Sequence, residues 1–308
     1  MRKVIGIGET ILDIIFAGDQ PKKAVPGGSV FNGLVSLGRL GTPVVLISEL
    51  GQDHIGEYIC QFMKENHIDT HYVDRYPKGK SPLSLAFLNE RSDAEYTFYH
   101  DYPVMRLEVP LPPIMKDDLF VFGSFYAVNP LLRSKVVEFL EHAKKSEALI
   151  YYDPNFRTAH VHEAVRLHST FIENFEYADI IRGSDEDFMN IFEESDMQRV
   201  YDNNLRFYCP YLITTHADKG VNLYTPSFQK HFDVPAISAL STIGAGDNFN
   251  AGIQQGLLKH NIRKEDLPQL TPEMWEAIIR CGIDLASEVC QSYDNYISVD
   301  FATNYNNS

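Results

Sequence analysis

The stretch Ser241-Thr242-Ile243-Gly244-Ala245-Gly246-Asp247-Asn248-Phe249-Asn250-Ala251-Gly252 places two glycines around an alanine, then a carboxylate, then a helical pattern. A Gly-Ala-Gly turn leaves backbone N–H groups uncovered, and a helix N-terminus adds unsatisfied donors at the positive end of its dipole. Such a turn binds an anion, most often a phosphate. Asp247 falls in the first helical turn, within reach of a ligand bound there. The alternative is an ordinary glycine-rich loop followed by an acidic first turn.

A second glycine-rich turn lies near the N-terminus. The segment Pro26-Gly27-Gly28-Ser29-Val30-Phe31-Asn32-Gly33 leads into leucines at helical spacing, and Asn32 is expected to face back toward the turn. A carboxylate, Asp13, follows the first apolar run of the chain. Carboxylate and amide groups can accept and donate hydrogen bonds, and glycines let a neighbouring group approach the backbone closely.

Composition limits the classes of function. The 308 residues are 44% hydrophobic and carry a formal net charge of −15, so a large core is possible and a nucleic-acid backbone would be repelled. No segment approaches the roughly 18 apolar residues of a membrane span. We therefore expect a cytoplasmic globular protein with no nucleic-acid or membrane partner. The four cysteines, Cys60, Cys209, Cys281 and Cys290, show no metal-binding spacing. The three clustered histidines also lack such spacing and are expected at solvated helical positions: His160, His162 and His168.

Short apolar runs alternate with helical patterns along most of the chain. Strands are predicted at 4–8, 44–48, 119–123, 149–153, 180–182 and 211–215, and helices at 53–66, 131–145 and 164–177. This alternation predicts an α/β fold with a mostly parallel central sheet flanked by helices on both faces. Ligands of such sheets lie at the carboxyl ends of the strands. Asp13, Asp153, Thr215 and the Gly244 turn are all expected to follow strands at that edge.

Two segments depart from the alternation. The runs 83–89 and 96–100 have alternating, β-branched or aromatic character and predict a hairpin around Glu90-Arg91-Ser92-Asp93. The segment 14–25 is a similar extended excursion. By themselves these features indicate surface strands with no assigned role.

The chain resembles the pfkB/ribokinase family of sugar kinases, which have Gly-Gly-x-x-x-Asn near the N-terminus and Gly-Ala-Gly-Asp near the C-terminus. Three further segments in the family's order extend the resemblance over nearly the whole chain: Gly51-Gln52-Asp53-His54-Ile55-Gly56, Asp153-Pro154-Asn155-Phe156-Arg157 and Thr215-His216-Ala217-Asp218-Lys219-Gly220. The resemblance implies a single ribokinase-like domain over 1–308. It also implies a small β-sheet lid from about 14–26 and 83–101, inserted in that domain and covering the sugar site.

The resemblance implies ATP-dependent transfer of a phosphoryl group to a sugar hydroxyl, with Mg²⁺. Asp247 would be the general base, and the turn Gly244, Ala245 and Gly246 would hold the transferring phosphoryl. Predicted substrate contacts are Asp13, Gly27, Gly28, Asn32, Phe98, Asn155 and Arg157. Structural alternatives remain for three of these residues: a strand-end turn at Asp13, hairpin packing at Phe98 and an Asx turn at Asn155.

The nucleotide is expected to contact Ser184, Thr215, Lys219 and Gly220. Ser184 and Asp187 occupy the place of the family's Asn-x-x-Glu motif, so Asp187 is a candidate Mg²⁺ residue, directly or through water. An N-capping serine with an acidic first turn explains the same residues without a ligand. Ala217 replaces a glycine of the family's nucleotide loop, which puts the shape of that loop in question.

Within the family, the lid strand and the Gly123-Ser124 strand end are most similar to fructokinases. A 2-keto-3-deoxygluconate kinase and a phosphosugar kinase, with Arg91 or Arg106 binding the substrate phosphate, are alternatives. A catalytically weak sugar- or nucleotide-binding regulator is a fourth. Ser241 stands where potassium-activated members commonly carry aspartate, so strong K⁺ dependence is not expected. The family also suggests a homodimer through the lid.

Overall fold

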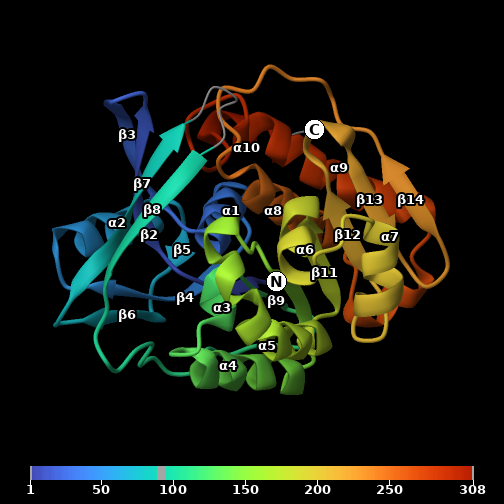
Figure 1. Cartoon of the computed structure of the whole chain (residues 1–308), viewed down its shortest axis with the longest axis horizontal. Helices are drawn as coiled ribbons and strands as arrows, with labels where there is room; N and C mark the ends of the chain where they lie inside the picture. The colour runs from blue at the N-terminus through green and yellow to red at the C-terminus, as the bar shows by residue number, and fades with distance from the viewer. Residues whose placement is uncertain (1, 89–93, 307–308) are drawn as a thin grey trace.

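The computed structural model describes residues 2–88 and 94–306, which form a large central sheet, a smaller sheet and two layers of helices (Figure 1). The central sheet has the strand order β14-β13-β12-β11-β10-β9-β1-β4-β5, with β6 paired to β4. Its neighbouring strands pair in parallel except at β13, which is antiparallel to both β12 and β14. Their bounds are β1 Val4–Ile7, β4 Val44–Gly51, β5 Ile68–Asp69, β6 Val73–Tyr76, β9 Leu119–Gly123, β10 Leu149–Asp153, β11 Ile180–Ser184, β12 Leu212–Thr215, β13 Val221–Tyr224 and β14 Gln229–Phe232.

Helices cover both faces of this sheet (Figure 1). One layer packs on the cluster that includes Leu119 and Val121, and the other on the cluster that includes Phe120 and Phe122, because successive strand residues point to opposite faces. The first layer comprises α1 Ser29–Arg39, α2 His54–Glu65, α8 Ala245–Lys259, α9 Pro272–Val289 and α10 Val299–Asn306. The second comprises α3 Ser124–Val128, α4 Arg133–Lys145, α5 Ala164–Tyr177, α6 Asp185–Phe192 and α7 Met197–Val200. Across residues 2–88 and 94–306, no helix is long and apolar enough to cross a bilayer.

The predicted α/β architecture is confirmed, and the strand ends meet at one edge as expected. Asp153 lies opposite Gly123, and Ser184 lies opposite Thr215. These four residues end strands β10, β9, β11 and β12, so the loops that follow them gather on the same side of the sheet. Strand β11 runs two residues beyond its predicted end at Arg182.

The smaller sheet, which we call the lid sheet, has the order β3-β2-β7-β8. Its strands are β2 Ile11–Ala17, β3 Gln20–Gly27, β7 Lys80–Leu88 and β8 Ala94–Asp101. The paired strands β7 and β8 confirm the predicted hairpin, whose turn at residues 90–93 lies outside the described residues. In Figure 1 the lid sheet projects from one side of the central layers.

Asp13 is placed differently from our expectation. It lies within β2 of the lid sheet, not in a loop after a central strand. Ile11, Asp13 and Ile15 alternate along β2 and all three are buried, and Asp13 pairs in register with Ser84 of β7. The period-2 pattern of this segment therefore makes it a strand, and the carboxylate reaches the site from the lid sheet.

Candidate active site

Two helices begin at bare glycines. The N-cap residues of α1 and α8 are Gly28, with φ 127°, and Gly244, with φ 78°, and no side chain in the described part of the chain caps either helix. A Cβ atom at Gly28 would lie 2.1 Å from the carbonyl oxygen of Glu9, and one at Gly244 would lie 2.5 Å from that of Asn295. Side chains are excluded from both positions, so the first N–H groups of both helices stay free of side-chain caps.

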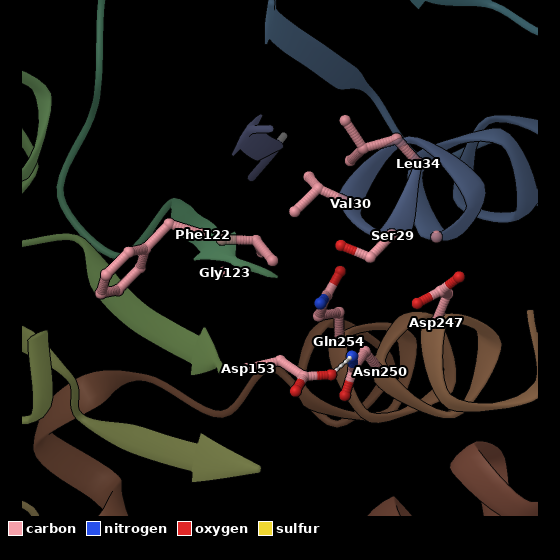
Figure 2. Close-up of a pocket in the computed structure, with 11 residues that line it drawn as sticks. Ser29, Val30, Leu34, Phe122, Gly123, Asp153, Asp247, Asn250 and Gln254 are labelled. Carbon is pink, nitrogen blue, oxygen red and sulfur yellow. Dashed lines mark hydrogen bonds between the residues drawn. The ribbon is translucent and has the colours of Figure 1, made fainter. Parts of the chain in front are cut away.

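The two helix starts face a pocket at the carboxyl ends of β9 and β10 (Figure 2). Ser29 and Val30 come from α1, Asp247 and Asn250 from α8, and Asp153 ends β10. Figure 2 shows Asp247 on the α8 side of this pocket, opposite the start of α1. Parallel α/β sheets bind ligands at this edge.

The carboxylate of Asp247 is buried and accepts a hydrogen bond from Asn32 Nδ2 at 2.8 Å. Burial raises the pKa of Asp247 to about 7, although the hydrogen bond from Asn32 and the positive charge of Arg157 favour the ionised form. A carboxylate with a pKa near neutrality is better suited to accept a proton than an exposed aspartate. This hydrogen bond joins the two glycine-rich segments, because Asn32 lies on α1 and Asp247 on the first turn of α8.

Asp13 forms a second buried carboxylate site. Its Oδ1 accepts a hydrogen bond from Ser84 Oγ at 2.5 Å, and its Oδ2 accepts one from Asn295 Nδ2 at 3.0 Å. Burial raises the pKa of Asp13 to about 6. Gly27 packs directly against this carboxylate, because a Cβ atom there would lie 2.0 Å from Oδ2 of Asp13. Gly27 therefore has no room for a side chain beside Asp13.

Strand β8 and the residue that follows it, Tyr102, present a row of stacked rings. Ring centroids are 5.6 Å apart for Tyr96 and Phe98, 6.0 Å for Phe98 and His100, and 5.4 Å for His100 and Tyr102. Burial and the negative charges of Asp13 and Asp247 raise the pKa of Tyr96. Tyr96 therefore lies in the field of both carboxylates, at the end of the row.

His160 corrects our expectation of a solvated helical position. Its ring stacks on Phe125 with a centroid distance of 4.2 Å and lies 6.4 Å from the ring of Phe98. The residue belongs to a short 3-10 helix, Thr158–Glu163, which follows β10 and turns toward the lid sheet. Phe98 therefore has ring neighbours both on its own strand and beyond the lid sheet.

A buried ion pair lies beside the pocket. Arg182 donates from Nη1 to Asp153 Oδ2 at 2.9 Å and from Nη2 to Thr215 Oγ1 at 2.6 Å. Asn250 Nδ2 donates to the same Asp153 oxygen at 2.5 Å. The predicted nucleotide residue Thr215 is thus connected to strand β10 and helix α8 through one guanidinium.

The two predicted substrate residues after β10, Asn155 and Arg157, lie in different surroundings. The backbone N–H of Asn155 donates to Asp153 Oδ1 at 3.0 Å, and Asn155 adopts φ 38°, so the segment forms the Asx turn that was one of our two interpretations. Arg157 is solvent-exposed, and its charge favours the ionised form of Asp247. The fold therefore brings the charge of Arg157 close enough to act on the carboxyl group of Asp247.

Ser184 and Asp187 form hydrogen bonds with each other. The backbone N–H and the Oγ of Ser184 donate to Asp187 Oδ2 at 2.7 and 2.6 Å, and the backbone N–H of Phe156 donates to Oδ1 at 2.6 Å. Together with the 3.1 Å bond from the Asp187 N–H to Ser184 Oγ, this is a capping box at the start of α6. Both predicted ligand residues are engaged in holding the helix end.

The described residues contain no group of three or more histidines, cysteines or carboxylates able to hold a metal ion. Mg²⁺ binds through one or two carboxylates together with substrate phosphates and water, and needs no protein cage. Two carboxylates, Asp153 and Asp247, line this pocket.

The loop after β12 keeps a glycine-like shape at Ala217. This residue has φ 47°, in the left-handed region that L-residues seldom adopt. Gly220 has φ 100°, and a Cβ atom there would lie 2.5 Å from the carbonyl oxygen of Phe232. Lys219 is exposed between them. Ala217 therefore keeps the left-handed backbone conformation that glycine would adopt easily, at a cost in strain.

Four polar residues of the site were not identified from the sequence: Ser84, Arg182, Asn250 and Asn295. Arg182 had a detectable signal, because a charged residue ended an otherwise apolar predicted strand. Asn250 lies one helical turn after Asp247 and so shares its face. Asn295 lies in a segment with no recognisable pattern, and its pairing with Asp13 joins residues 282 positions apart.

Comparison with known proteins identifies the family of this chain and relatives of its fold. A profile described as the pfkB family carbohydrate kinase matches residues 1–301. The probable fructokinase-6, chloroplastic, of Arabidopsis thaliana is 26% identical over 266 residues, which cover 81% of this chain and 68% of that protein. Two solved structures share the fold. Aminoimidazole riboside kinase from Salmonella enterica has a TM-score of 0.81 at 21% identity and covers 99% of both chains. A fructokinase double mutant from Vibrio cholerae has a TM-score of 0.81 at 19% identity, covering 97% of this chain and 95% of that one.

Proposed function

The chain belongs to the pfkB family of carbohydrate kinases and is a sugar kinase, and we propose that it uses ATP to phosphorylate fructose, forming fructose 6-phosphate. One observation carries the mechanism: Asp247 is a buried carboxylate with a raised pKa, placed on the first turn of a helix that begins at a bare glycine. An uncapped helix start attracts the phosphoryl group, and the neighbouring carboxylate attracts the hydroxyl proton.

In the proposed reaction, the sugar hydroxyl oxygen forms a bond to the γ-phosphorus of ATP as the bond from that phosphorus to the β–γ bridging oxygen breaks. ADP leaves with the bridging oxygen, and the hydroxyl proton passes to Asp247. Because the transition state of phosphoryl transfer is loose, the proton leaves late and a carboxylate is a sufficient base. The N–H groups of Gly244, Ala245 and Gly246 are placed to hold the transferring phosphoryl.

Asp13 and its neighbours are proposed to bind the sugar. The carboxylate of Asp13, with Ser84 and Asn295 around it, offers paired acceptors and donors for hydroxyl groups. Gly27 makes room for the Asp13 carboxylate, and Gly28 begins α1 without a side chain. Asn32 orients Asp247, and Phe98 lies on the ring-lined face of β8. Asn155 and Arg157 complete the site at the end of β10.

Fructose is favoured because the curated relatives include fructokinases and because Arg106 is not free to bind a substrate phosphate. Arg106 is buried and donates to Glu49 Oε1 from Nε at 3.0 Å, and its guanidinium lies 3.5 Å from the ring centre of Tyr102. Arg91, the other candidate cation, lies outside the described residues. The 2-keto-3-deoxygluconate and phosphosugar alternatives are outcomes of the assay below.

ATP and Mg²⁺ are proposed as the phosphoryl donor complex. The solved relative from Vibrio cholerae contains fructose, ADP and a potassium ion. Thr215, Lys219 and Gly220 lie on the proposed nucleotide side of the site, and Mg²⁺ would enter on the phosphates. When bound, Mg²⁺ would neutralise phosphate charge, and Asp187 would contribute by fixing the start of α6.

We also propose a cytoplasmic location and pairing of two copies through the lid sheets. Four buried free thiols suit a reducing compartment. The exposed Phe87 stacks on Phe16 across the lid strands, with ring centroids 4.8 Å apart, and supplies apolar surface for a second copy. Light scattering during size-exclusion chromatography tests the pairing: wild type is expected as a dimer and Phe87→Lys as a monomer.

The function is tested by ADP release with Mg-ATP against fructose, ribose, 2-keto-3-deoxygluconate, adenosine and fructose 6-phosphate, with Asp247→Asn assayed beside wild type. Turnover on fructose that disappears in the Asp247→Asn variant supports the proposal. Turnover on another compound keeps the chemistry and replaces the substrate. ATP binding without turnover on any compound contradicts the assignment as a fructokinase.

A further inference from the structure

Arg182 is a buried cation beside the anion-binding turn, with 7% of its side chain exposed. If an atom were added as Cβ on Gly246, it would lie 3.0 Å from Nη1 and 3.2 Å from Nη2 of Arg182. The guanidinium therefore packs against the backbone of the Gly-Ala-Gly turn. Gly246 has no side chain to separate the two.

Three elements fix this guanidinium in place. Asp153 at the end of β10 accepts from Nη1, Thr215 at the end of β12 accepts from Nη2, and the ring of Phe249 on α8 lies 5.6 Å from the guanidinium carbon. These contacts use one N–H on each terminal nitrogen, and each terminal nitrogen carries a second. The Nε–H is buried and has no partner among residues 2–88 and 94–306. Three of the five N–H donors therefore remain beyond the bonds to Asp153 and Thr215.

Neutralising Asp153 does not by itself explain this arrangement. Asp153 also accepts a hydrogen bond from Asn250, and the ion pair with Asp153 uses only one of the five guanidinium N–H groups. A nucleotide phosphate chain must enter a site that already holds Asp153, Asp187 and Asp247, in a protein of net charge −15. A fixed cation at the anion turn offsets this repulsion, and the planar fork of arginine matches phosphate oxygens.

We propose that Arg182 is a phosphate-binding catalytic residue, whose free N–H donors bind the phosphate chain of the nucleotide at the Gly244–Gly246 turn. Asp153 and Thr215 act as positioning residues that aim the guanidinium. The proposal rests on the sugar kinase function proposed above. It assigns stabilisation of phosphoryl charge to a side chain as well as to the backbone of α8.

The test compares Arg182→Gln with wild type in two measurements. The first is steady-state kinetics with Mg-ATP and the sugar that wild type turns over. The second is calorimetric binding of AMP and of an ATP analogue with a β,γ-imido bridge. We expect kcat to fall by about 100-fold or more, which is typical of removing one transition-state donor. Binding of the ATP analogue should weaken at least tenfold, while binding of AMP changes by less than about threefold.

Two further variants separate this role from a structural one. Arg182→Gln combined with Asp153→Asn restores a neutral, hydrogen-bonding pair and is used if the single variant does not fold; the same loss of ATP-analogue binding over AMP binding is expected. Arg133→Gln is the matched control, because Arg133 also holds a carboxylate, Glu173, together with Asn174, but on helices α4 and α5. This control should keep kcat and nucleotide binding.

A folded Arg182 variant with kcat within about fivefold of wild type would overturn the proposal. So would an equal loss of affinity for AMP and for the ATP analogue, which would indicate general distortion of the nucleotide site. Failure of the underlying function is seen separately, because wild type itself would then show no ADP release with any sugar.

Discussion

Helices α6 and α8 both begin at the pocket edge of the sheet and both carry an aspartate at their third position, yet the two carboxylates do different things. The carboxylate of Asp187 receives hydrogen bonds from Ser184 and from the backbone of Phe156, and it closes its own helix end. Helix α8 starts at Gly244, which offers no side chain, and Asp247 instead meets Asn32 of α1. The residue at the N-cap therefore decides whether the third-position carboxylate is structural or available for chemistry.

The largest expected difference is in turnover. Asp247→Asn preserves size but removes the proton acceptor, so kcat should fall by about 10³-fold, within the range expected for a lost general base. Asp187→Asn should leave kcat within about tenfold of wild type, because its oxygens are engaged in the capping box. Steady-state kinetics on both variants measures the contrast. Equal losses of kcat in the two variants would show that the comparison is wrong.

The two substitutions should also change stability in opposite directions. The folded-state pKa of Asp247 is about 7, above the ordinary value of 3.8, so the folded protein holds a proton that the unfolded chain releases. Wild type therefore loses stability as the pH rises from about 4 to about 7. Asp247→Asn does not titrate and should be more stable than wild type at pH 8, by a few kcal/mol.

Asp187→Asn should be less stable than wild type at pH 8 by about 1 kcal/mol, the usual cost of weakening a helix cap. Urea unfolding of wild type and both variants at pH 5, 6, 7 and 8 gives these differences. If the unfolding free energies of Asp247→Asn and wild type differ by the same amount at every pH, the folded protein does not raise the pKa of Asp247.

A smaller effect on stability is expected in the loop after β12, where Ala217 is held at φ 47°. Ala217→Gly removes the cost of a left-handed alanine, partly offset by the greater freedom of glycine in the unfolded chain, so it should stabilise the protein by up to about 1 kcal/mol. The matched control is Ala277→Gly within helix α9, which should destabilise by about 0.5–1 kcal/mol. Thermal unfolding of both variants measures these effects. If Ala217→Gly lowers the stability, Ala217 is not strained in the folded protein.

The smallest effect is expected from the monovalent cation. Ser241 is buried just before the α8 start, and its Oγ accepts a hydrogen bond from the Ile243 N–H at 3.2 Å. A hydroxyl is a weaker K⁺ ligand than a carboxylate, so replacing Na⁺ by K⁺ should change the rate by less than about twofold. Rates in matched chloride buffers test this. A large activation by K⁺ would show that other groups near α8 hold the cation.

The contrast between α6 and α8 also explains what the sequence could predict. Local patterns sufficed for the parallel strands and for both helix starts, because apolar runs and glycine turns act within a few residues. The same patterns left Ser184 and Asp187 with two interpretations, since a capping box and a ligand pair use the same residue types.

Pairings between distant segments were beyond local reasoning. Asp13 was expected in a loop, but the alternation of Ile11, Asp13 and Ile15 fits a strand once Ser84 of β7 lies beside it. Asn295 reaches Asp13 from near the C-terminus, and Arg182 reaches Thr215 across neighbouring strands. Each of these contacts depends on strand order, which a single sequence does not display.

The pH dependence of kcat/KM for the sugar tests the central claim most directly, because it reports the pKa of the base in the free enzyme. We expect kcat/KM of wild type, and of Asp187→Asn, to rise with pH and to level off above about 7, following ionisation of Asp247. A profile that is flat from pH 5.5 to pH 8 would contradict the assignment of Asp247 as the base.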